Sequence, residues 1–571
     1  MSAARRVRVS WGGAVLALCA GALALRLWGV EHGLPYSYNA DENAHFVPTA
    51  IGLFGHGWNP HYFVNPPGYT YLLHAAFALW FGGREAVYHA YATHPSEIFV
   101  VARVCSALIG TLAVWLLYLA GARLFDRRTG LLAAAILAVA FLPVFYSHEA
   151  LNDVPTLAPI ALSLWGTAGI LRFGRTRDYL VAGLGLGIAC AVKYTGGVVI
   201  APLLAAAAIH GGSRRGGGPV PALRGLLLAG ALALAGFLAL NPYALLDFQA
   251  FRDGLRHQTS VADDSFGKLG LTESSGHLYY LWTATWGLGW VPAIAAAGGA
   301  VVSLLRDRRI AAVLIPAPVL FIAFMGTQSR YFGRWLLPVF PVLCLLAAYC
   351  ALWLADRAAG RVPALRPALL ALAAVAMCGQ GLIYSIHQGL LLSRPDTRNL
   401  ARAWLVANLP VTAKIVVEPV VPDYWASDIG HPSPLTSNGY RWVKWPTSRT
   451  NVGPDGRFAF GGGSIVNIED YERGLFPGLV AQYRRLGYCW VVSGSTQRGR
   501  AEAEPHAVPR AIAYYRELER QSTIAYEASP YRAGARPPRF NFDWSFDFYP
   551  LAYSRPGPLM TIYRLRGCTP H

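Results

Sequence analysis

The stretch of residues 98–145, IFVVARVCSALIGTLAVWLLYLAGARLFDRRTGLLAAAILAVAFLPVF, decides the class of fold. Two apolar runs lie here, 98–121 and 130–147, the second of which extends two residues beyond the stretch. A short turn with Arg123, Arg127 and Arg128 separates them. A helix needs about 20 apolar residues to cross the hydrocarbon core of a bilayer. Both runs approach that length, so the stretch predicts two membrane-spanning helices joined by a basic loop.

The rest of the chain repeats this pattern. Of its 571 residues, 54% are hydrophobic and 14% are charged, whereas about a quarter of the residues of a soluble globular protein are charged. The apolar runs predict about eleven transmembrane helices, near 11–30, 98–121, 130–147, 154–171, 179–192, 195–210, 225–242, 279–304, 310–326, 335–355 and 367–386. The apolar piece 69–81 is short for a span and follows Pro66 and Pro67, so we interpret it as an interfacial or re-entrant helix. The sequence thus predicts a polytopic α-helical membrane protein.

The arginines set the expected orientation. A formal net charge of +18 would also suit a nucleic-acid-binding protein, but the arginines gather in short loops between apolar runs, and such loops lie on the cytoplasmic side of a membrane. The N-terminus is therefore expected to be cytoplasmic, and nucleic acid is not an expected partner. An odd number of crossings places the C-terminus outside, together with the segments 31–96, 147–153, 243–277 and 327–334.

The apolar runs stop near residue 386, and the remainder, 387–571, reads as an extracytoplasmic α/β domain. Helices are expected at 396–410, 475–486 and 508–520, and strands at 414–418, 488–493 and 559–564, with a loop at 453–463. Cys489 and Cys568 are the cysteines outside the apolar runs, and whether they form a disulfide is left open. The aromatic segment 540–550 is expected either to pack against the helices or to contact an acceptor.

Acidic residues mark two of the outer segments. Asp41 and Glu42 are adjacent in YSYNADENAHF, residues 36–46, and Asp153 follows His148 and Glu149 in YSHEALNDVP, residues 146–155. A carboxylate beside lipid is costly without a partner or a task, which favours catalysis or metal binding. The alternative is helix capping, which Asp41 and Asp153 could both provide.

The order of these features resembles the lipid-carrier-dependent glycosyltransferases of the GT-C class, and within it the protein O-mannosyltransferases and aminoarabinose transferases. The likeness rests on the Asp41–Glu42 loop, the segment NPPGYTYLLHAAFALWFG at 65–82, ARLFDRRTGLLAA at 122–134 and the following outer acid. It implies that Asp41 is the catalytic acid and Asp153 the second acid of the site. His148 and Glu149 depart from the context expected in aminoarabinose transferases, and a β-trefoil insertion is missing, which leaves the acceptor open.

Sugar transfer from a polyprenyl phosphate to a hydroxyl requires a carboxylate base and positive charge on the leaving phosphate. We expect Asp41 to act as the base, with Glu42 and Asp153 beside it as catalytic acids, in an inverting reaction. The expected ligands of the phosphate are Lys193 and three residues of QSRYFGR at 328–334, namely Arg330, Tyr331 and Arg334. Snorkelling of basic side chains to the interface is the alternative reading of these residues.

Several assignments stay open at this level. His148, Glu149, Arg256 and Lys268 are expected in an acceptor or supporting role. A divalent cation held by Asp41, Asp153 and His148 is an alternative way to neutralise the phosphate. The expected partners are a polyprenyl-phosphate-linked sugar, membrane lipids and a protein, lipid or glycan acceptor, in a bacterial inner membrane. The alternative function is a transporter or flippase of a lipid-linked glycan, which usually carries its ionisable residues near the bilayer midplane.

Overall fold

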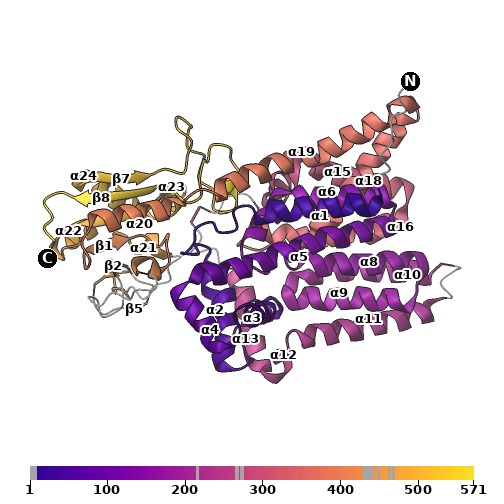
Figure 1. Cartoon of the computed structure of the whole chain (residues 1–571), viewed down its shortest axis with the longest axis horizontal. Coiled ribbons are helices and arrows are strands. Elements are labelled where there is room, and N and C mark those ends of the chain that lie inside the picture. Colours follow the sequence, from indigo (N-terminus) through magenta and orange to yellow (C-terminus); the bar gives the residue numbers. More distant parts are fainter. Residues whose placement is uncertain are drawn as a thin grey trace.

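The computed structural model describes residues 10–213, 218–263, 269–270, 275–428, 441–446, 451–460, 464–465 and 470–570. Long helices run side by side over most of its length, and the β-strands gather at the end opposite the N-terminus (Figure 1). Lys268, one of the predicted supporting residues, lies outside the described residues. The predicted fold class, a bundle of apolar helices followed by a small α/β domain, is confirmed.

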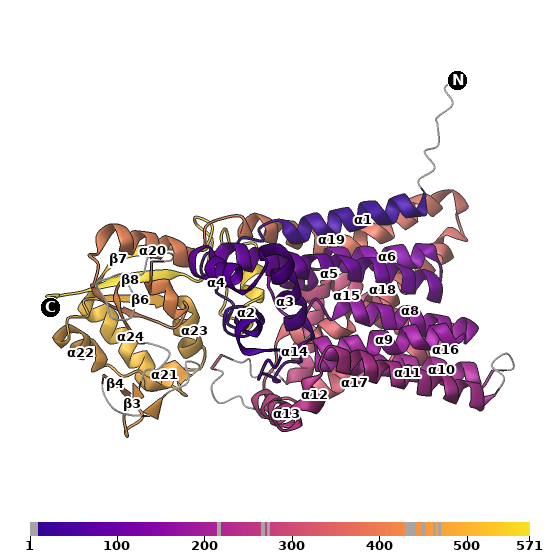
Figure 2. The same cartoon turned by 60° about the horizontal axis from the view of Figure 1, so that its bottom comes forward.

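The first helices are α1 (Trp11–Leu27), η1 (Glu42–Phe46), α2 (Val47–His56), α3 (Gly68–Phe81) and α4 (Arg84–Thr93). The helices α2, α3 and α4 lie at the end of the bundle that faces the C-terminal domain (Figure 2). As predicted, α3 starts directly after Pro67 as a separate helix. In Figure 1 it is seen nearly end-on while the long helices run across the view, so it does not run along the bundle.

The bundle continues with α5 (Pro95–Leu124), α6 (Arg127–Val139), α7 (Phe141–Phe145), η2 (Tyr146–His148), α8 (Leu157–Phe173), α9 (Thr176–Val192), η3 (Tyr194–Val199), α10 (Ile200–Gly211), α11 (Pro219–Ala239), α12 (Tyr243–Leu246), α13 (Phe248–Asp263), α14 (Gly276–Ala284), η4 (Thr285–Gly289), α15 (Trp290–Arg306), α16 (Arg308–Leu314), α17 (Pro316–Met325), η5 (Gly333–Val339), α18 (Phe340–Ala359), η6 (Pro363–Leu365) and α19 (Arg366–Leu392).

Local sequence explains where several of these helices begin. The Asp126 side chain accepts a hydrogen bond from the Thr129 N–H and caps α6, and Asp307 caps α16 in the same way. Both acids sit in the basic loops, so capping accounts for them. The division that the sequence predicted at Lys193 is confirmed, because α9 ends at Val192 and the chain turns there before α10.

Seven of the described helices are long and apolar enough to cross a membrane, and eight are if the pair formed by α6 and α7–η2, bent by 59°, counts as one span. The shorter helices α1, α8 and α9, of 17 residues each, would complete the predicted set. The number of crossings stays a prediction. The helices pack closely where residues are small: a Cβ on Gly183 or Gly187 of α9 would overlap the backbone of α11 at Ala229 and Ala233, the mode of packing expected between helices in lipid.

The C-terminal domain contains α20 (Thr397–Asn408), β1 (Lys414–Val417), η7 (Asp423–Ala426), β2 (Val443–Trp445), β3 (Asn451–Val452), β4 (Phe458–Ala459), β5 (Ser464–Ile465), α21 (Tyr471–Gly474), α22 (Leu479–Arg485), β6 (Trp490–Gly494), α23 (Ser495–Ala503), α24 (Pro509–Gln521), β7 (Ser522–Ala528), η9 (Phe546–Phe548) and β8 (Met560–Leu565).

Its main sheet has the order β2-β1-β6-β8-β7, with β2, β1 and β6 parallel and β8 and β7 antiparallel. The three predicted strands are present, whereas β2, β7 and α23 were not predicted. The prediction of a loop at 453–463 was wrong in part, since β4 pairs with β3 there; strands of two residues are too short for an alternating pattern to reveal them. Cys489 and Cys568 form a disulfide, which resolves the alternative that the sequence left open.

The aromatic segment 540–550 returns from this domain to the helices. The Tyr549 ring stacks on Tyr384 of α19 at 4.0 Å between centroids, and its hydroxyl accepts a hydrogen bond of 2.9 Å from Gln380. Of the two readings of this segment, packing against the helices is therefore the one that the structure favours.

Candidate active site

Asp41 lies at the start of η1, in a loop whose Gly33 and Leu34 carbonyl oxygens accept hydrogen bonds from Asn399 of the C-terminal domain. Its side chain makes no capping hydrogen bond; instead, Asn39 Oδ1 accepts a hydrogen bond of 3.0 Å from the Asp41 N–H. Asn39 therefore caps this turn and leaves the Asp41 carboxylate available. Asp41 Oδ2 lies 2.6 Å from Arg334 Nη2.

Arg334 also approaches the second predicted acid. Its Nη1 lies 3.8 Å from Asp153 Oδ2, and Asp153 Oδ1 accepts a hydrogen bond from the Lys193 ammonium group. Two carboxylates and two cations thus form one continuous cluster. The Asp41 side chain is 33% exposed, whereas that of Asp153 is 2% exposed, so Asp41 is the carboxylate that a ligand can reach.

Three structural breaks bring this cluster together. Asp153 lies in the turn before α8, Lys193 at the break between α9 and η3, and Arg334 at the start of η5. The first two segments are joined by Asn152, whose Nδ2 donates a hydrogen bond of 2.9 Å to the Val192 carbonyl oxygen. The polar side chains therefore meet where helices are interrupted, which frees backbone groups to be bonded by side chains.

The electrostatics of Asp41 are set by opposing effects. Burial raises the pKa of its carboxyl group, but the charge and hydrogen bond of Arg334, with smaller contributions from His45 and Lys193, bring the pKa below its ordinary value. Asp41 is therefore ionised at neutral pH. Its basicity is held down for as long as Arg334 remains bound to it.

Glu42 has a different environment from its neighbour. Its carboxylate is fully buried and accepts hydrogen bonds from Arg103 Nε at 2.8 Å, Arg103 Nη2 at 2.7 Å, the Ala150 N–H at 2.8 Å and the Ser37 hydroxyl. Both carboxylate oxygens are thus engaged by the protein, unlike those of Asp41, and a catalytic role of Glu42 stays a prediction. Glu42 ties the loop of Asp41 to the segment of Asp153.

The predicted metal site is not assembled. His148 Nδ1 and Nε2 face the carbonyl oxygens of Val144 and Trp28 at 2.9 and 3.1 Å. Asp41 and Asp153 are bound to Arg334 and Lys193, and no group of three His, Cys, Asp or Glu side chains in the described part of the chain is arranged to hold a metal ion. The structure therefore does not bring the His148 ring to the two acids, because both ring nitrogens face backbone carbonyl oxygens.

Glu149 lies in the same buried region, 3.6 Å from His32 Nε2. Burial, followed by the charge of Glu42, raises the pKa of Glu149 well above its ordinary value. The direction of this shift favours the protonated form, which suits a supporting position.

The remaining predicted residues differ in position. Tyr331 is buried, with its ring 4.4 Å from that of Tyr279, and the Arg330 N–H donates to the Ala262 carbonyl oxygen at 3.0 Å. Both flank Arg334 along the chain, so their role at the phosphate stays a prediction. Arg256 lies on α13 with a largely exposed side chain, 3.7 Å from Asp253.

Sequence reasoning missed Asp543. Its Oδ2 accepts hydrogen bonds from the Gly333 N–H at 2.5 Å and from the Tyr279 hydroxyl at 2.7 Å, which fixes the backbone next to Arg334. The signal was present as an acid among aromatics in FNFDWSFDFYP, but nothing local related it to a residue more than 200 positions away.

Comparisons with known proteins agree with the expected resemblance. Residues 96–239 match the family described as dolichyl-phosphate-mannose-protein mannosyltransferase. The fold is similar to that of ArnT from Cupriavidus metallidurans, in a structure bound to undecaprenyl phosphate, with a TM-score of 0.50 and 13% identity over 98% of this chain and 99% of that chain. It is also similar to the apo oligosaccharyltransferase from Archaeoglobus fulgidus, with a TM-score of 0.51 and 15% identity over 92% of this chain and 74% of that chain. A comparison with curated proteins finds no match.

Proposed function

We propose, from the premise that this chain is a multi-span membrane protein of the GT-C glycosyltransferase type, that it transfers a sugar from a polyprenyl-phosphate donor to a hydroxyl acceptor. The acceptor belongs to a protein, a lipid or a glycan. The reaction takes place on the extracytoplasmic face of a bacterial inner membrane and inverts the configuration of the sugar.

One observation carries this proposal: Arg334 bridges Asp41 and Asp153, and Lys193 pairs with Asp153 from the other side. A base and two phosphate-binding cations are the groups that the reaction needs, and here they share one cluster. Arginine binds phosphate through two parallel N–H groups, whereas lysine supplies a point charge. The pair Arg334 and Lys193 thus suits a phosphate whose negative charge increases as the sugar leaves.

The proposed reaction is a single displacement. The acceptor oxygen forms a bond to C1 of the sugar while the bond between C1 and the phosphate oxygen breaks. The acceptor proton passes to the Asp41 carboxylate, and the electron pair leaves on the polyprenyl phosphate, where Arg334 and Lys193 stabilise it. Attack from the face opposite the phosphate inverts C1.

Arg334 links donor binding to the basicity of Asp41. In the free enzyme its hydrogen bond and charge keep the pKa of Asp41 low. A donor phosphate competes for the same guanidinium, and as Arg334 turns toward it, Asp41 becomes a stronger base. Asp153 is left paired with Lys193, so it keeps that ammonium group in place and acts as a positioning residue.

The alternative, a flippase, has less support because Asp153 precedes α8, Lys193 follows the end of α9 and Arg334 is at the start of η5, so none of the three lies in the middle of a long helix. The proposed domain boundary places residues 387–571 outside the membrane. It is supported by Asp543, which accepts a hydrogen bond from the Gly333 N–H, next to Arg334 in the chain.

The test is release of labelled sugar from a panel of hexosyl and pentosyl polyprenyl phosphates by the purified full chain in lipid. Asp41→Asn is expected to lower turnover by about 1,000-fold, as loss of a general base typically does. Asp253→Asn, which neutralises an exposed acid on α13, is the matched control and should keep wild-type turnover. Transfer by folded Asp41→Asn at the wild-type rate would exclude Asp41 as the base.

A second readout separates the enzyme from the flippase. If no donor is turned over by the wild type, while lipid-linked sugar still crosses the bilayer of vesicles that contain the protein, the transferase proposal is wrong and the flippase is supported.

A further inference from the structure

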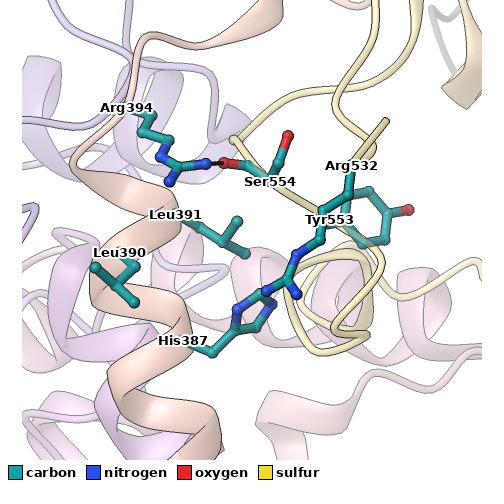
Figure 3. A pocket seen from close by; sticks show the side chains of 7 residues that line it. All are labelled: His387, Leu390, Leu391, Arg394, Arg532, Tyr553 and Ser554. Carbon is teal, nitrogen blue, oxygen red and sulfur yellow. Dashed lines mark hydrogen bonds between the residues drawn. The ribbon is translucent and has the colours of Figure 1, made fainter. Parts of the chain in front are cut away.

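A pocket of 260 Å³ lies where the end of α19 meets the C-terminal chain between residues 530 and 554. Figure 3 shows His387 and Arg394 from α19 and its end, and Arg532 from the C-terminal chain, around the same space. None of its lining residues belongs to the cluster of Asp41, Asp153, Lys193 and Arg334. The pocket is therefore a separate feature of the molecule.

The polar side of the pocket is cationic. Arg394 Nη1 donates a hydrogen bond of 2.7 Å to the Ser554 carbonyl oxygen, which holds the guanidinium at the rim. The Arg532 backbone is fixed by a hydrogen bond of 2.8 Å from its N–H to the Ala552 carbonyl oxygen, while its side chain remains exposed. Burial lowers the pKa of His387, and the charges of Arg532 and Arg394 lower it further. Within the described ranges, neither arginine forms an ion pair with an acid.

The other side of the pocket is apolar and continues along α19. Leu390 lines the pocket and is 48% exposed, and Ile386 and Ile383 are exposed one and two turns before it, respectively. Residues spaced by three and four positions share one face of a helix. This face of α19 therefore presents an apolar strip to the surroundings that ends at the two arginines.

We propose that this pocket binds the phosphate head group of an anionic membrane lipid, whose chains lie along the apolar strip of Leu390, Ile386 and Ile383. An apolar strip ending in two cations matches an amphiphile with an anionic head. Arginine binds phosphate bidentately, and basic groups next to a membrane attract anionic lipids.

Simple snorkelling explains one arginine at a helix end, but it does not explain the second. Arg532 comes from a segment distant in sequence and is brought to the same pocket as Arg394 by the fold of the C-terminal domain. A single head group bound to both bridges the last helix of the bundle and that domain. Lipid binding is thereby expected to stabilise the junction of the two parts.

The experiment uses the full chain, purified and stripped of lipid, with dioleoylphosphatidylglycerol as the probe and native mass spectrometry as the measure of affinity. Arg394→Gln and Arg532→Gln are each expected to weaken binding about fivefold, the effect of one basic residue at a membrane surface. The matched control is Arg536→Gln, which removes one positive charge, as each pocket variant does, from the exposed segment that follows Arg532 and lies outside the pocket. It should leave the affinity unchanged.

Three results would overturn the proposal. The first is equal loss of affinity in the pocket variants and in the control. The second is equally tight binding of zwitterionic dioleoylphosphatidylcholine. The third combines two measurements: inorganic phosphate binds only when both arginines are present, and Leu390→Asn leaves the lipid affinity unchanged. The site would then recognise free phosphate and not a lipid. As a control for folding, each variant should unfold without lipid at the same midpoint temperature as the wild type.

Discussion

Replacing Glu42 or Glu149 by glutamine tests how the two outer segments are held together. Both glutamates are buried and lie close to one another, yet we expect opposite results. Glu42 carries the charge that pairs with buried Arg103 through bonds of 2.8 and 2.7 Å. Glu149 is expected to be protonated, because burial and the charge of Glu42 raise its pKa.

Removing one partner of a buried ion pair costs about 3–5 kcal/mol, because the other charge stays buried without compensation. For Glu42→Gln we expect about 3 kcal/mol, the lower end, since glutamine still accepts a hydrogen bond from the Ala150 N–H and Glu149 can ionise in place of Glu42. Glutamine has the shape of a protonated glutamic acid, so Glu149→Gln is expected to cost less than about 1 kcal/mol.

The assay is thermal unfolding in the same detergent at pH 7, followed by tryptophan fluorescence at one fixed scan rate, since membrane proteins often unfold irreversibly. Turnover is measured in parallel. Because Glu42 joins the loop of Asp41 to the segment of Asp153, Glu42→Gln is also expected to reduce turnover, by about 100-fold if the acids move by about 1 Å. Equal destabilisation by the two variants would refute the reasoning, since Glu149 would then be ionised in the native protein.

The other predictions concern the C-terminal domain and helix packing. Burial raises the pKa of Glu418 to about 7. The protonated side chain therefore contributes its full stabilisation of the fold below about pH 4.5, and this stabilisation is lost as the pH rises to about 7. In thermal unfolding, wild type should lose about 3 kcal/mol of stability over this pH range relative to Glu418→Gln. Replacing Cys489 and Cys568 by serine opens a link between residues 79 positions apart and should destabilise the domain by about 4 kcal/mol, whereas adding reductant to the double variant should change nothing further. Gly187→Ala should lower the unfolding midpoint, because its Cβ meets the backbone of α11, whereas Gly230→Ala, with open space around it, should not.

Much of the fold follows from signals that are local in the sequence. Apolar runs such as 98–121 are long enough to require lipid around them, and acids such as Asp126 cap the helices that follow basic turns. Lys193 marks the break between α9 and α10. These features depend on neighbours within a few turns, so they can be read before the tertiary structure is known.

The candidate site was also predicted in part from local sequence. The sequence identifies Asp41, Asp153, Lys193 and Arg334 as polar residues at the ends of apolar runs, and the structure brings these four together. The sequence does not show which of the adjacent acids Asp41 and Glu42 belongs to the cluster. Successive residues of a helical turn point about 100° apart, and which of the two faces the open cluster depends on Arg103 and on Arg334, the latter 293 positions along the chain.

Contacts between distant segments were decided by the tertiary structure alone. Asp543 reaches Gly333 from the last part of the chain, and Arg532 joins Arg394 at the end of α19. Such pairs have no periodicity and no fixed spacing, because their distance in space depends on how the C-terminal domain packs on the bundle. The sequence by itself determined that the chain needs a membrane and where its helices break, since hydrophobicity and capping act locally, whereas charge pairing across the fold depends on the packing of all the helices at once.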